Sequence, residues 1–392
     1  MSIIDRKIFQ LADKYWKQLA MLVLLLFSFL IRRSMFKVQG EALDWGVYLA
    51  PWIQEYRELG FKGLGHIIGD YYIPYNIILA IIAQLPFPDY YSVALVSYLF
   101  ELGMSFELYL LAKKHLNYSS FNAAFIAILV LFLPITFLGS SYWKQCDAIY
   151  TFFSLAGIRH LLSNRPNKGL IMVGLALSFK LQAVFILPFC CYLYFKKRNI
   201  PLLSFLWIPG IFLLSGLPAI LFGRSVTSTY GAYLTQVHSS RFMSINSANI
   251  WAFVPEGLDL YGAAIILCFS LLLACYVALY PRRQNEKDLL ILASWTVITC
   301  FMFLPAMHER YDFVGLILLY LCAFGGHFLW VSALLMHLVS MLTYLEYLLQ
   351  LTYSIPVMSC FYLAGYVILT YKMLTSVFFS RPMPTDEHLK TM

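Results

Sequence analysis

Asp44 is the sharpest candidate for a chemical role in this sequence. It follows the first long apolar run and begins the stretch DWGVYLAPW, which also holds Trp45, Tyr48 and Trp52. A carboxylate above an apolar wall can have its pKa tuned and can accept a proton. Asp44 is therefore a candidate general base, and a solvated loop aspartate is the alternative.

Asp70 and Tyr71 open the stretch DYYIPY, which leads into another apolar run. That run and the nearby Pro74 favour a helix N-cap at Asp70. A cap does not exclude a role in a binding site, so both interpretations stay open. We count Asp70 and Tyr71 among the candidate substrate-binding residues.

A second polar group, YWKQCDA, contains Lys144, Gln145 and Asp147 at the start of an apolar run. These three side chains are candidates for binding a substrate together. Alternatively, Asp147 caps the helix that begins there or pairs with Lys144.

Lys180 and Gln182 lie in the stretch SFKLQA, in the middle of the apolar run 169–195. An ionisable group at membrane depth is costly and usually functional, so Lys180 is expected to face a cavity and meet an anion. A structural pair with Asp147 or another carboxylate is the alternative. The run is expected to form two short helices with a turn at Lys180 and Gln182.

The stretch MHERY places His308, Glu309 and Arg310 after another apolar run. Arg310 could bind a phosphate in a forked geometry, whereas an ion pair between Glu309 and Arg310 at the rim is the alternative. No second His or Cys lies at ligand spacing from His308. We therefore expect no metal cofactor, although a divalent cation is left open.

The composition predicts the class of fold. Of the 392 residues, 61% are hydrophobic and only 12% are charged, whereas a soluble domain has about 25% charged residues. Many apolar runs approach the roughly 20 residues that span a bilayer, so we expect an all-α, polytopic transmembrane helical bundle. The net charge of +8 is assigned to cytoplasmic loops and not to nucleic-acid binding. The eight cysteines form no CxxC pair and are expected in the core.

Basic clusters predict how the chain crosses the membrane. The basic N-terminus lies inside, and residues 18–37 cross outward as a retained helix because no small-residue cleavage site follows. Residues 38–72 form the first external loop, whose amphipathic middle is expected to form a short interfacial helix. Residues 223–250 form the second long external loop. The other apolar segments are residues 73–86, 90–112, 121–138, 148–162, 169–195, 200–222, 262–280, 288–305, 312–325, 328–350 and 355–375.

The number of crossings depends on residues 73–86 and 90–112. If both cross fully, Lys113 and Lys114 fall outside, against the positive-inside rule, so one segment could be partial or re-entrant. We therefore expect about 11–13 membrane segments in a single membrane domain, residues 1–392.

All of the polar groups above fall on the outer side in this topology. Together they predict a pocket at the outer membrane surface, with one or two carboxylates facing Lys180, Arg310 and the further candidate Lys144. The apolar helices below could hold a lipid tail. A carboxylate, phosphate-binding cations and lipid access together indicate transfer of a group from a lipid phosphate.

The order of six stretches resembles the GT-C superfamily of integral-membrane glycosyltransferases. The stretches are the Asp44 loop, DYYIPY, YWKQCDAIYTFF, SFKLQAVFILPF, SINSANIWAF and MHERYDF. They cover about residues 40–315. The chain looks most like bacterial mannosyltransferase-like members and the dolichyl-phosphate-glucose-dependent glucosyltransferases of N-glycan assembly.

The resemblance implies a polyprenyl-phosphate sugar donor, an inverting transfer and an external-loop aspartate as the general base, a position that Asp44 matches. Asp70 matches the first residue of the family's DYPP-like element, although Tyr72 replaces the first proline here. Lys144 stands where the family commonly has glycine. The first loop has no DxD or ExD pair, so the resemblance does not support a required metal.

The expected function is transfer of one hexose from a polyprenyl-phosphate donor to a cell-envelope glycan or glycolipid acceptor. The expected location is the bacterial inner membrane, with the active site on the outer face. Two other classes stay open. A transporter or flippase of lipid-linked glycans would carry polar residues along a path through the bundle. An O-acetyl or phospho-group transferase would depend on a catalytic histidine or serine.

Overall fold

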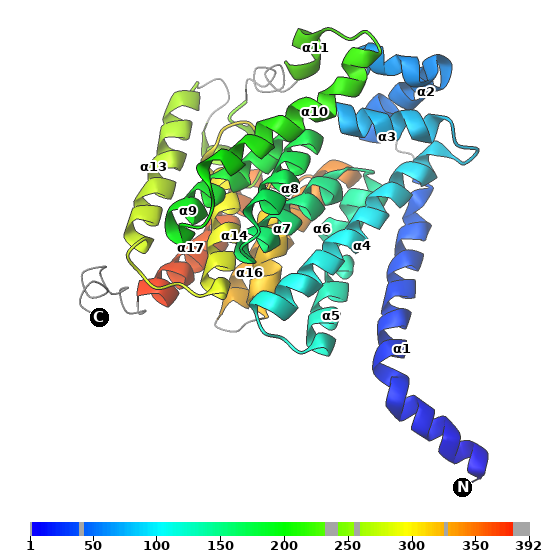
Figure 1. Ribbon diagram of the computed structural model, residues 1–392, viewed down its shortest axis with the longest axis vertical. Helices are drawn as coiled ribbons and strands as arrows, with labels where there is room; N and C mark the ends of the chain where they lie inside the picture. Colours follow the sequence, from blue (N-terminus) through cyan, green and yellow to red (C-terminus); the bar gives the residue numbers. More distant parts are fainter. Residues whose placement is uncertain (1, 39–42, 232–241, 255–258, 325–327, 379–392) are drawn as a thin grey trace.

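A computed structural model describes residues 2–38, 43–231, 242–254, 259–324 and 328–378 of the chain. Helices make up 80% of it and strands almost none, which confirms the predicted all-α class. Figure 1 shows most of the helices packed side by side in one bundle, with α1 at its edge.

The bundle contains long and short helices. The longer helices are α1 Ile3–Phe36, α4 Asp89–His115, α7 Asp147–Leu162, α8 Pro166–Phe179, α10 Trp207–Leu221, α13 Tyr261–Leu279, α14 Glu286–Phe303, α16 Leu329–Leu349 and α17 Ile355–Phe378. The shorter helices are α2 Ala50–Leu59, α3 Ile73–Ala83, α5 Ser120–Leu129, α6 Pro134–Phe137, α9 Leu187–Lys197, α11 Val226–Tyr230 and α15 Phe313–Ala323.

Other elements are brief. The 3-10 helices are Gly60–Gly65, Val130–Phe132, Leu181–Ile186, Leu202–Leu206 and Ile250–Phe253, and the π-helical turns are Trp45–Leu49 and Leu138–Tyr142. The strands β1 Ser244–Ile245 and β2 Met307–His308 pair in parallel, with Ser244 opposite Met307.

Among the described residues, six helical segments are long and apolar enough to cross a membrane: Ile3–Phe36, Asp89–His115, Leu202–Leu221, Tyr261–Leu279, Leu329–Leu349 and Ile355–Phe378. A seventh is the bent pair Ser120–Phe132 and Pro134–Tyr142, if its two arms form one span across their 57° bend. The chain is thus an integral membrane protein, as predicted. Several of the 11–13 segments expected from the sequence are instead shorter helices packed within the bundle.

The helix α3 removes the uncertainty in the predicted crossings. It has 11 residues, which extend over about 16 Å, roughly half of the hydrocarbon core. The next helix, α4, lies antiparallel to α1: the Phe36 and Tyr91 rings meet edge-to-face with centroids 4.8 Å apart, and Ser28 and Tyr98 share a hydrogen bond of 3.1 Å. Therefore α4 begins where α1 ends.

Basic loops gather at the opposite end of the bundle. His115 at the end of α4 bonds Ser163 after α7, and Lys197 at the end of α9 donates to the carbonyl of Leu162. Lys196 donates to the carbonyl of Tyr280 after α13. We call this the basic end, and the opposite end, where Figure 1 shows α2, α3 and α11 together, the α2–α3 end.

The centre of the bundle is built on α14, which is buried from Asp288 to Phe303. A helix that is apolar on all sides is expected inside a protein. Its three hydroxyl groups bond nearby carbonyls, as when Ser294 donates to Gly315 on α15 at 2.8 Å. This rigid core positions the loop between α14 and α15.

Both predicted external loops contain structure. The first, residues 38–72, folds into a π-helical turn, α2 and a 3-10 helix, so the predicted short helix is present. The second, residues 223–250, contains α11 and β1. Residues 39–42 and 232–241 of these loops lie outside the described residues.

Candidate active site at the α2–α3 end

Four connections bring the predicted polar residues together at the α2–α3 end. Asp44 precedes the π-helical turn that leads into α2, and Gln145 lies in the connection before α7. Lys180 stands between α8 and the 3-10 helix that follows it, and Arg310 comes after β2. We call the resulting group the polar cluster. Its members are Asp44, Gln145, Asp147, Lys180, Glu309 and Arg310.

Asp44 is held by two hydrogen bonds, one on each carboxylate oxygen. Gln145 donates from Nε2 to Oδ2 at 2.5 Å, and Tyr347 donates from its hydroxyl to Oδ1 at 2.8 Å. Arg310 Nη2 lies 3.9 Å from Oδ2, and the Asp44 side chain is 15% exposed. The carboxylate is therefore fixed in orientation yet reachable from outside.

Sequence reasoning missed Tyr347 and Trp143. Tyr347 lies near the end of α16, beyond the stretches that carry the family resemblance. The indole of Trp143 stacks on the Tyr347 ring at 4.7 Å, and the Arg310 guanidinium lies 4.6 Å from the indole centre. With 28 tyrosines in the chain, the sequence gives no signal that singles out Tyr347.

Lys180 and Asp147 form a buried ion pair of 2.5 Å. Lys180 has an extended backbone, with φ −152° and ψ 135°, so the predicted interruption of the 169–195 run is present. The second oxygen of Asp147 lies 3.9 Å from Arg310 Nε. Neither alternative considered for Asp147 is seen. Asp147 pairs with Lys180 and not with Lys144. The N-cap residue of α7 is Cys146, without a side-chain bond.

Arg310 joins the two halves of the polar cluster. Its Nη1 bonds Glu309 Oε1 at 2.7 Å. This pair is buried, since Glu309 is 2% exposed, and is not the rim contact considered as the alternative. The Nε group of Arg310 is buried and has no hydrogen-bond partner among the described residues, so one donor of the guanidinium fork is left without a bond. His308 lies beside Glu309 and is 32% exposed.

Neighbouring charges and burial act against each other on the acids of this region. Burial would raise the pKa of Glu309, but the charge of Arg310 and a bond with His308 hold that pKa below its usual value. Glu309 is therefore ionised at neutral pH. Asp70 reaches the surface, yet the protein around it removes enough water to raise its pKa, against the attraction of Lys180 and Arg310.

The predicted residues Asp70 and Tyr71 border the polar cluster. Tyr71 donates from its hydroxyl to Gln145 Oε1 at 3.2 Å, which helps to orient the amide that holds Asp44. The N-cap position of α3 belongs to Tyr72, without a side-chain bond, so the cap expected at Asp70 is wrong. Pro74 does lie in the first turn of α3, as predicted.

Lys144 and Gln182 do not join the polar cluster. The ammonium of Lys144 is fully buried and donates to the carbonyls of Val38 and Tyr142, and burial lowers its pKa to about 8. Its φ of 63° is in the left-handed region that favours glycine. Gln182 instead lines, with Tyr150, a narrow gap that has no room for a water molecule.

Asp312 is a further buried acid that sequence reasoning did not select. It precedes α15 and accepts a hydrogen bond of 2.9 Å from Tyr362. Burial raises the pKa of Asp312 to about 8, so this carboxyl is mostly protonated at neutral pH. It is therefore unsuited to the role of a base and packs as a neutral group beside the charged cluster.

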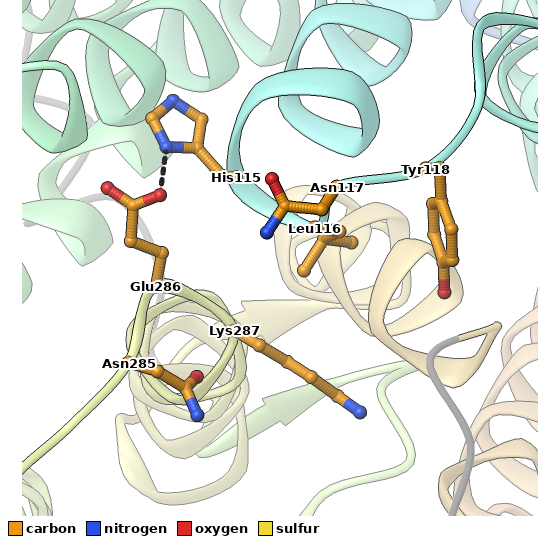
Figure 2. Close-up of a pocket in the computed structure, with 7 residues that line it drawn as sticks. All are labelled: His115, Leu116, Asn117, Tyr118, Asn285, Glu286 and Lys287. Atoms are coloured by element: carbon orange, nitrogen blue, oxygen red, sulfur yellow. Dashed lines mark hydrogen bonds and ion pairs between the residues drawn. The ribbon is translucent and has the colours of Figure 1, made fainter.

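A cleft of about 550 Å³ lies at the other end of the bundle (Figure 2). It is lined by His115, Leu116, Asn117, Tyr118, Asn285, Glu286 and Lys287, and His115 Nδ1 contacts Glu286 at 2.9 Å. These residues stand at the C-terminal end of α4 and the N-terminal end of α14. Since the polar cluster follows the opposite end of α14, the cleft is not part of the candidate site.

Within the part of the chain that the structure describes, no three His, Cys, Asp or Glu side chains gather as metal ligands. No protein-family model matches this chain, and no curated protein is similar to it. The function therefore has to be argued from the geometry of the polar cluster.

Proposed function

We propose that this protein is a GT-C-type membrane glycosyltransferase. It would move one hexose from a polyprenyl-phosphate donor to a cell-envelope glycan or glycolipid acceptor. One observation carries the proposal: Asp44 and Arg310, 266 positions apart in sequence (310 − 44), lie 3.9 Å from each other at one end of the bundle. A fixed carboxylate beside a cation with spare donors suits removal of a proton from an alcohol next to a departing phosphate.

In the proposed reaction, Asp44 takes the proton of an acceptor hydroxyl. The acceptor oxygen attacks the anomeric carbon and forms the new glycosidic bond. The bond from that carbon to the phosphate oxygen breaks, and its electron pair leaves with the polyprenyl phosphate. Attack and departure occur on opposite faces of the sugar, so the anomeric configuration is inverted. The bonds from Gln145 and Tyr347 keep the carboxylate oriented toward the acceptor.

Arg310 and Lys180 are the proposed phosphate ligands. The guanidinium of Arg310 bonds Glu309 through Nη1 and has Nε without a hydrogen-bond partner in the described structure. Lys180 bonds Asp147 with one of its three N–H groups. Both cations thus keep donors for a phosphate whose charge grows as the sugar leaves, and this favours the transition state.

The distribution of basic residues supports a site on the outer face. Lys113 and Lys114 end α4, and Arg165 and Lys168 flank the start of α8, all at the basic end. Because cytoplasmic loops collect lysine and arginine, the basic end would face the cytoplasm and the polar cluster the opposite side. A bacterial inner membrane with the site facing outward fits this arrangement.

A carrier of lipid-linked glycans is the second candidate, because two buried ion pairs lie along α4. Arg32 bonds Glu101 at 2.5 Å, and Arg159 bonds Glu107 at 2.5 Å, closer to the basic end. Such charges could line a path. Arg32 also donates to two backbone carbonyls, so its donors are already used within the bundle, which favours a structural role.

A reconstitution experiment separates the two candidates. Purified protein in liposomes is supplied with radiolabelled polyprenyl-phosphate hexoses and an acceptor extract from the envelope. Transfer of label into a new product supports the transferase. If no donor yields product while a fluorescent lipid-linked sugar crosses the bilayer faster than in empty liposomes, the transferase proposal is rejected in favour of the carrier.

Removal of Arg310 is expected to weaken donor binding. Hydrogen bonds to charged groups contribute about 1.5–3 kcal/mol, so Arg310→Ala should raise the donor Kd by roughly tenfold to a hundredfold. Arg310→Lys keeps the charge but not the fork and should show a smaller loss of affinity. Lys180→Ala should act in the same direction. Binding of radiolabelled donor to protein in nanodiscs measures these effects.

The matched control for Arg310 is Arg57→Ala. Arg57 forms an ion pair of 2.6 Å with Asp89 on the same end of the bundle, but its side chain is 41% exposed. Its loss should leave donor affinity unchanged. Equal affinity in the wild type, Arg310→Ala and Lys180→Ala would remove both residues from the phosphate site.

Tyr347 is expected to act as a positioning residue for Asp44. Tyr347→Phe deletes the hydroxyl that bonds Oδ1 and keeps the ring stacked on Trp143. We expect kcat to fall about tenfold with KM nearly unchanged, the size of one lost bond to a charged group. Tyr344→Phe is the control, because Tyr344 contacts the same indole edge-on at 5.3 Å. Equal kcat values for both variants would show that the Asp44 bond has no catalytic importance.

A further inference from the structure

The helix α1 is longer than a bilayer requires. It has 34 residues, which extend over about 51 Å at the α-helical rise. The hydrocarbon core of roughly 30 Å takes up about 20 residues. The C-terminal part of α1 is the part that packs on the bundle, where Ser28 and Arg32 are fully buried. The surplus therefore lies at the N-terminal side of the helix.

Trp16 marks the level at which α1 leaves the bundle. Its ring contacts Phe121 edge-on at 5.8 Å, and the Lys17 ammonium lies 5.0 Å from the same Phe121 ring. Phe121 belongs to the first turn of α5, which follows the lysines at the basic end. Figure 1 shows the N-terminal part of α1 pointing away from the bundle below this end.

The first turns of α1 have two chemically different faces. At 100° per residue, an apolar face is formed by positions spaced four and three residues apart. It consists of Ile4, Ile8, Leu11 and Tyr15, bordered by Phe9 and Trp16. The opposite face consists of Arg6, Lys7, Gln10, Asp13, Lys14 and Lys17, with Ile3 as its one apolar member in the first turn.

No other described part of the chain covers the apolar face. Ile4 is 69% exposed, Ile8 56% and Leu11 57%. The polar face holds four cations and one anion, Asp13. The other acid, Asp5, is engaged at the helix start, where it bonds the backbone of Ser2 in a capping box. The face opposite the apolar residues thus has a net charge of +3.

We propose that residues 3–17 of α1 lie along the membrane surface at the basic end and bind anionic phospholipid headgroups. An amphipathic helix with lysine and arginine opposite its apolar face matches the boundary between headgroups and acyl chains. Long basic side chains can extend toward the headgroups while their stems stay with the apolar residues. The segment is continuous with a spanning helix, so it is already held at this boundary.

The charge distribution favours lipid over a second copy of the chain. Contact through the apolar face with another protein would leave four cations facing solution. An anionic leaflet instead takes up the apolar face and attracts the cations together. This surface is independent of the polar cluster at the α2–α3 end, and its test needs no sugar transfer.

Hydrogen exchange of the full chain in nanodiscs tests the proposal. The discs contain phosphatidylcholine alone or mixed with one third phosphatidylglycerol. We expect the amides of residues 6–17 to exchange about tenfold more slowly in the anionic discs. This protection should fall in 1 M salt, where the Debye length is only about 3 Å. The variant R6Q/K7Q/K14Q/K17Q should lose it.

A variant with the same change in charge is the control. K113Q/K114Q/R165Q/K168Q removes four exposed cations from the ends of α4 and α8 at the basic end and should keep the lipid-dependent protection. Equal exchange of residues 6–17 in both disc types overturns the proposal. If that equal exchange is slow and the protein is dimeric by light scattering, a second copy covers the apolar face instead of lipid.

Discussion

Asp44→Asn is expected to reduce sugar transfer by a factor of about 10² to 10⁴, the contribution typical of a positioned general base. The amide has nearly the same shape as the carboxylate and can still accept the bond from Tyr347, but it cannot take a proton. Gln145 can rotate its amide to offer oxygen in place of nitrogen, so the fold has no reason to change. Single-turnover transfer from a radiolabelled donor measures the chemical step directly.

Measuring the donor affinity of the variant distinguishes loss of the catalytic base from loss of the donor-binding site. Asp44→Asn should retain the donor affinity of the wild type, since the proposed phosphate ligands are unaltered. Asp89→Asn serves as the control, because Asp89 is an aspartate on the same end whose partner is Arg57. Full activity of Asp44→Asn would exclude Asp44 as the base. Loss of activity in Asp89→Asn to the same degree would point to general damage of this end.

The meeting of the polar residues could be predicted from the sequence because each one stands at the edge of an apolar run. When successive runs form antiparallel helices, alternate edges return to the same end of the bundle. Asp44, Lys180 and Arg310 follow this rule, and the structure brings them together. The helix break at Lys180 was predictable for the same reason, since a lysine cannot lie unpaired within an apolar helix.

The partners of these residues could not be predicted. Whether Lys180 or Lys144 pairs with Asp147 depends on where the end of α8 packs against α7, which is a property of the whole fold. The backbone carbonyls that surround Lys144 carry no sequence signal at all. Tyr347 was missed because hydrogen bonding to Asp44 arises from the packing of α16 on Trp143.

For a related reason, fewer helices of the described residues are long and apolar enough to span a membrane than the 11–13 segments expected from the sequence. An apolar run indicates burial, and burial within a helical bundle looks the same in sequence as burial in lipid. The helix α15 has 11 residues, too few to cross a bilayer, and is buried from Phe313 to Cys322. Only the positions of neighbouring helices distinguish these two environments.

Glu101→Leu is expected to cause the largest loss of stability. Glu101 and Arg32 are fully buried between α4 and α1 and form an ion pair of 2.5 Å. Removing one partner of a buried pair typically costs about 3–5 kcal/mol, because the other charge is left without compensation. A guanidinium does not lose its proton under these conditions, so the stranded Arg32 cannot become neutral. Thermal unfolding of the detergent-purified protein measures the effect, with the amount of monodisperse protein that remains after heating as the readout.

The matched control compares two ion pairs of similar length. Asp89→Ala breaks the exposed pair with Arg57, 2.6 Å long, and should change stability by less than about 1 kcal/mol. The double variant R32M/E101L should recover most of the loss, since no uncompensated charge is left. Equal destabilisation by Glu101→Leu and Asp89→Ala would show that burial of the Arg32 pair has little energetic importance.

Recovery in the double variant should be incomplete, because Arg32 has a second role. It donates from Nη2 to the carbonyl of Leu131 at 2.7 Å. Leu131 lies just before the bend of 57° that precedes α6, and Pro134 has no N–H with which to continue the helical bonding there. A carbonyl released at such a break needs another donor inside a membrane protein. R32M/E101L should therefore remain less stable than the wild type by about one hydrogen bond, roughly 1 kcal/mol. A double variant as stable as the wild type would show that the Leu131 carbonyl finds another donor.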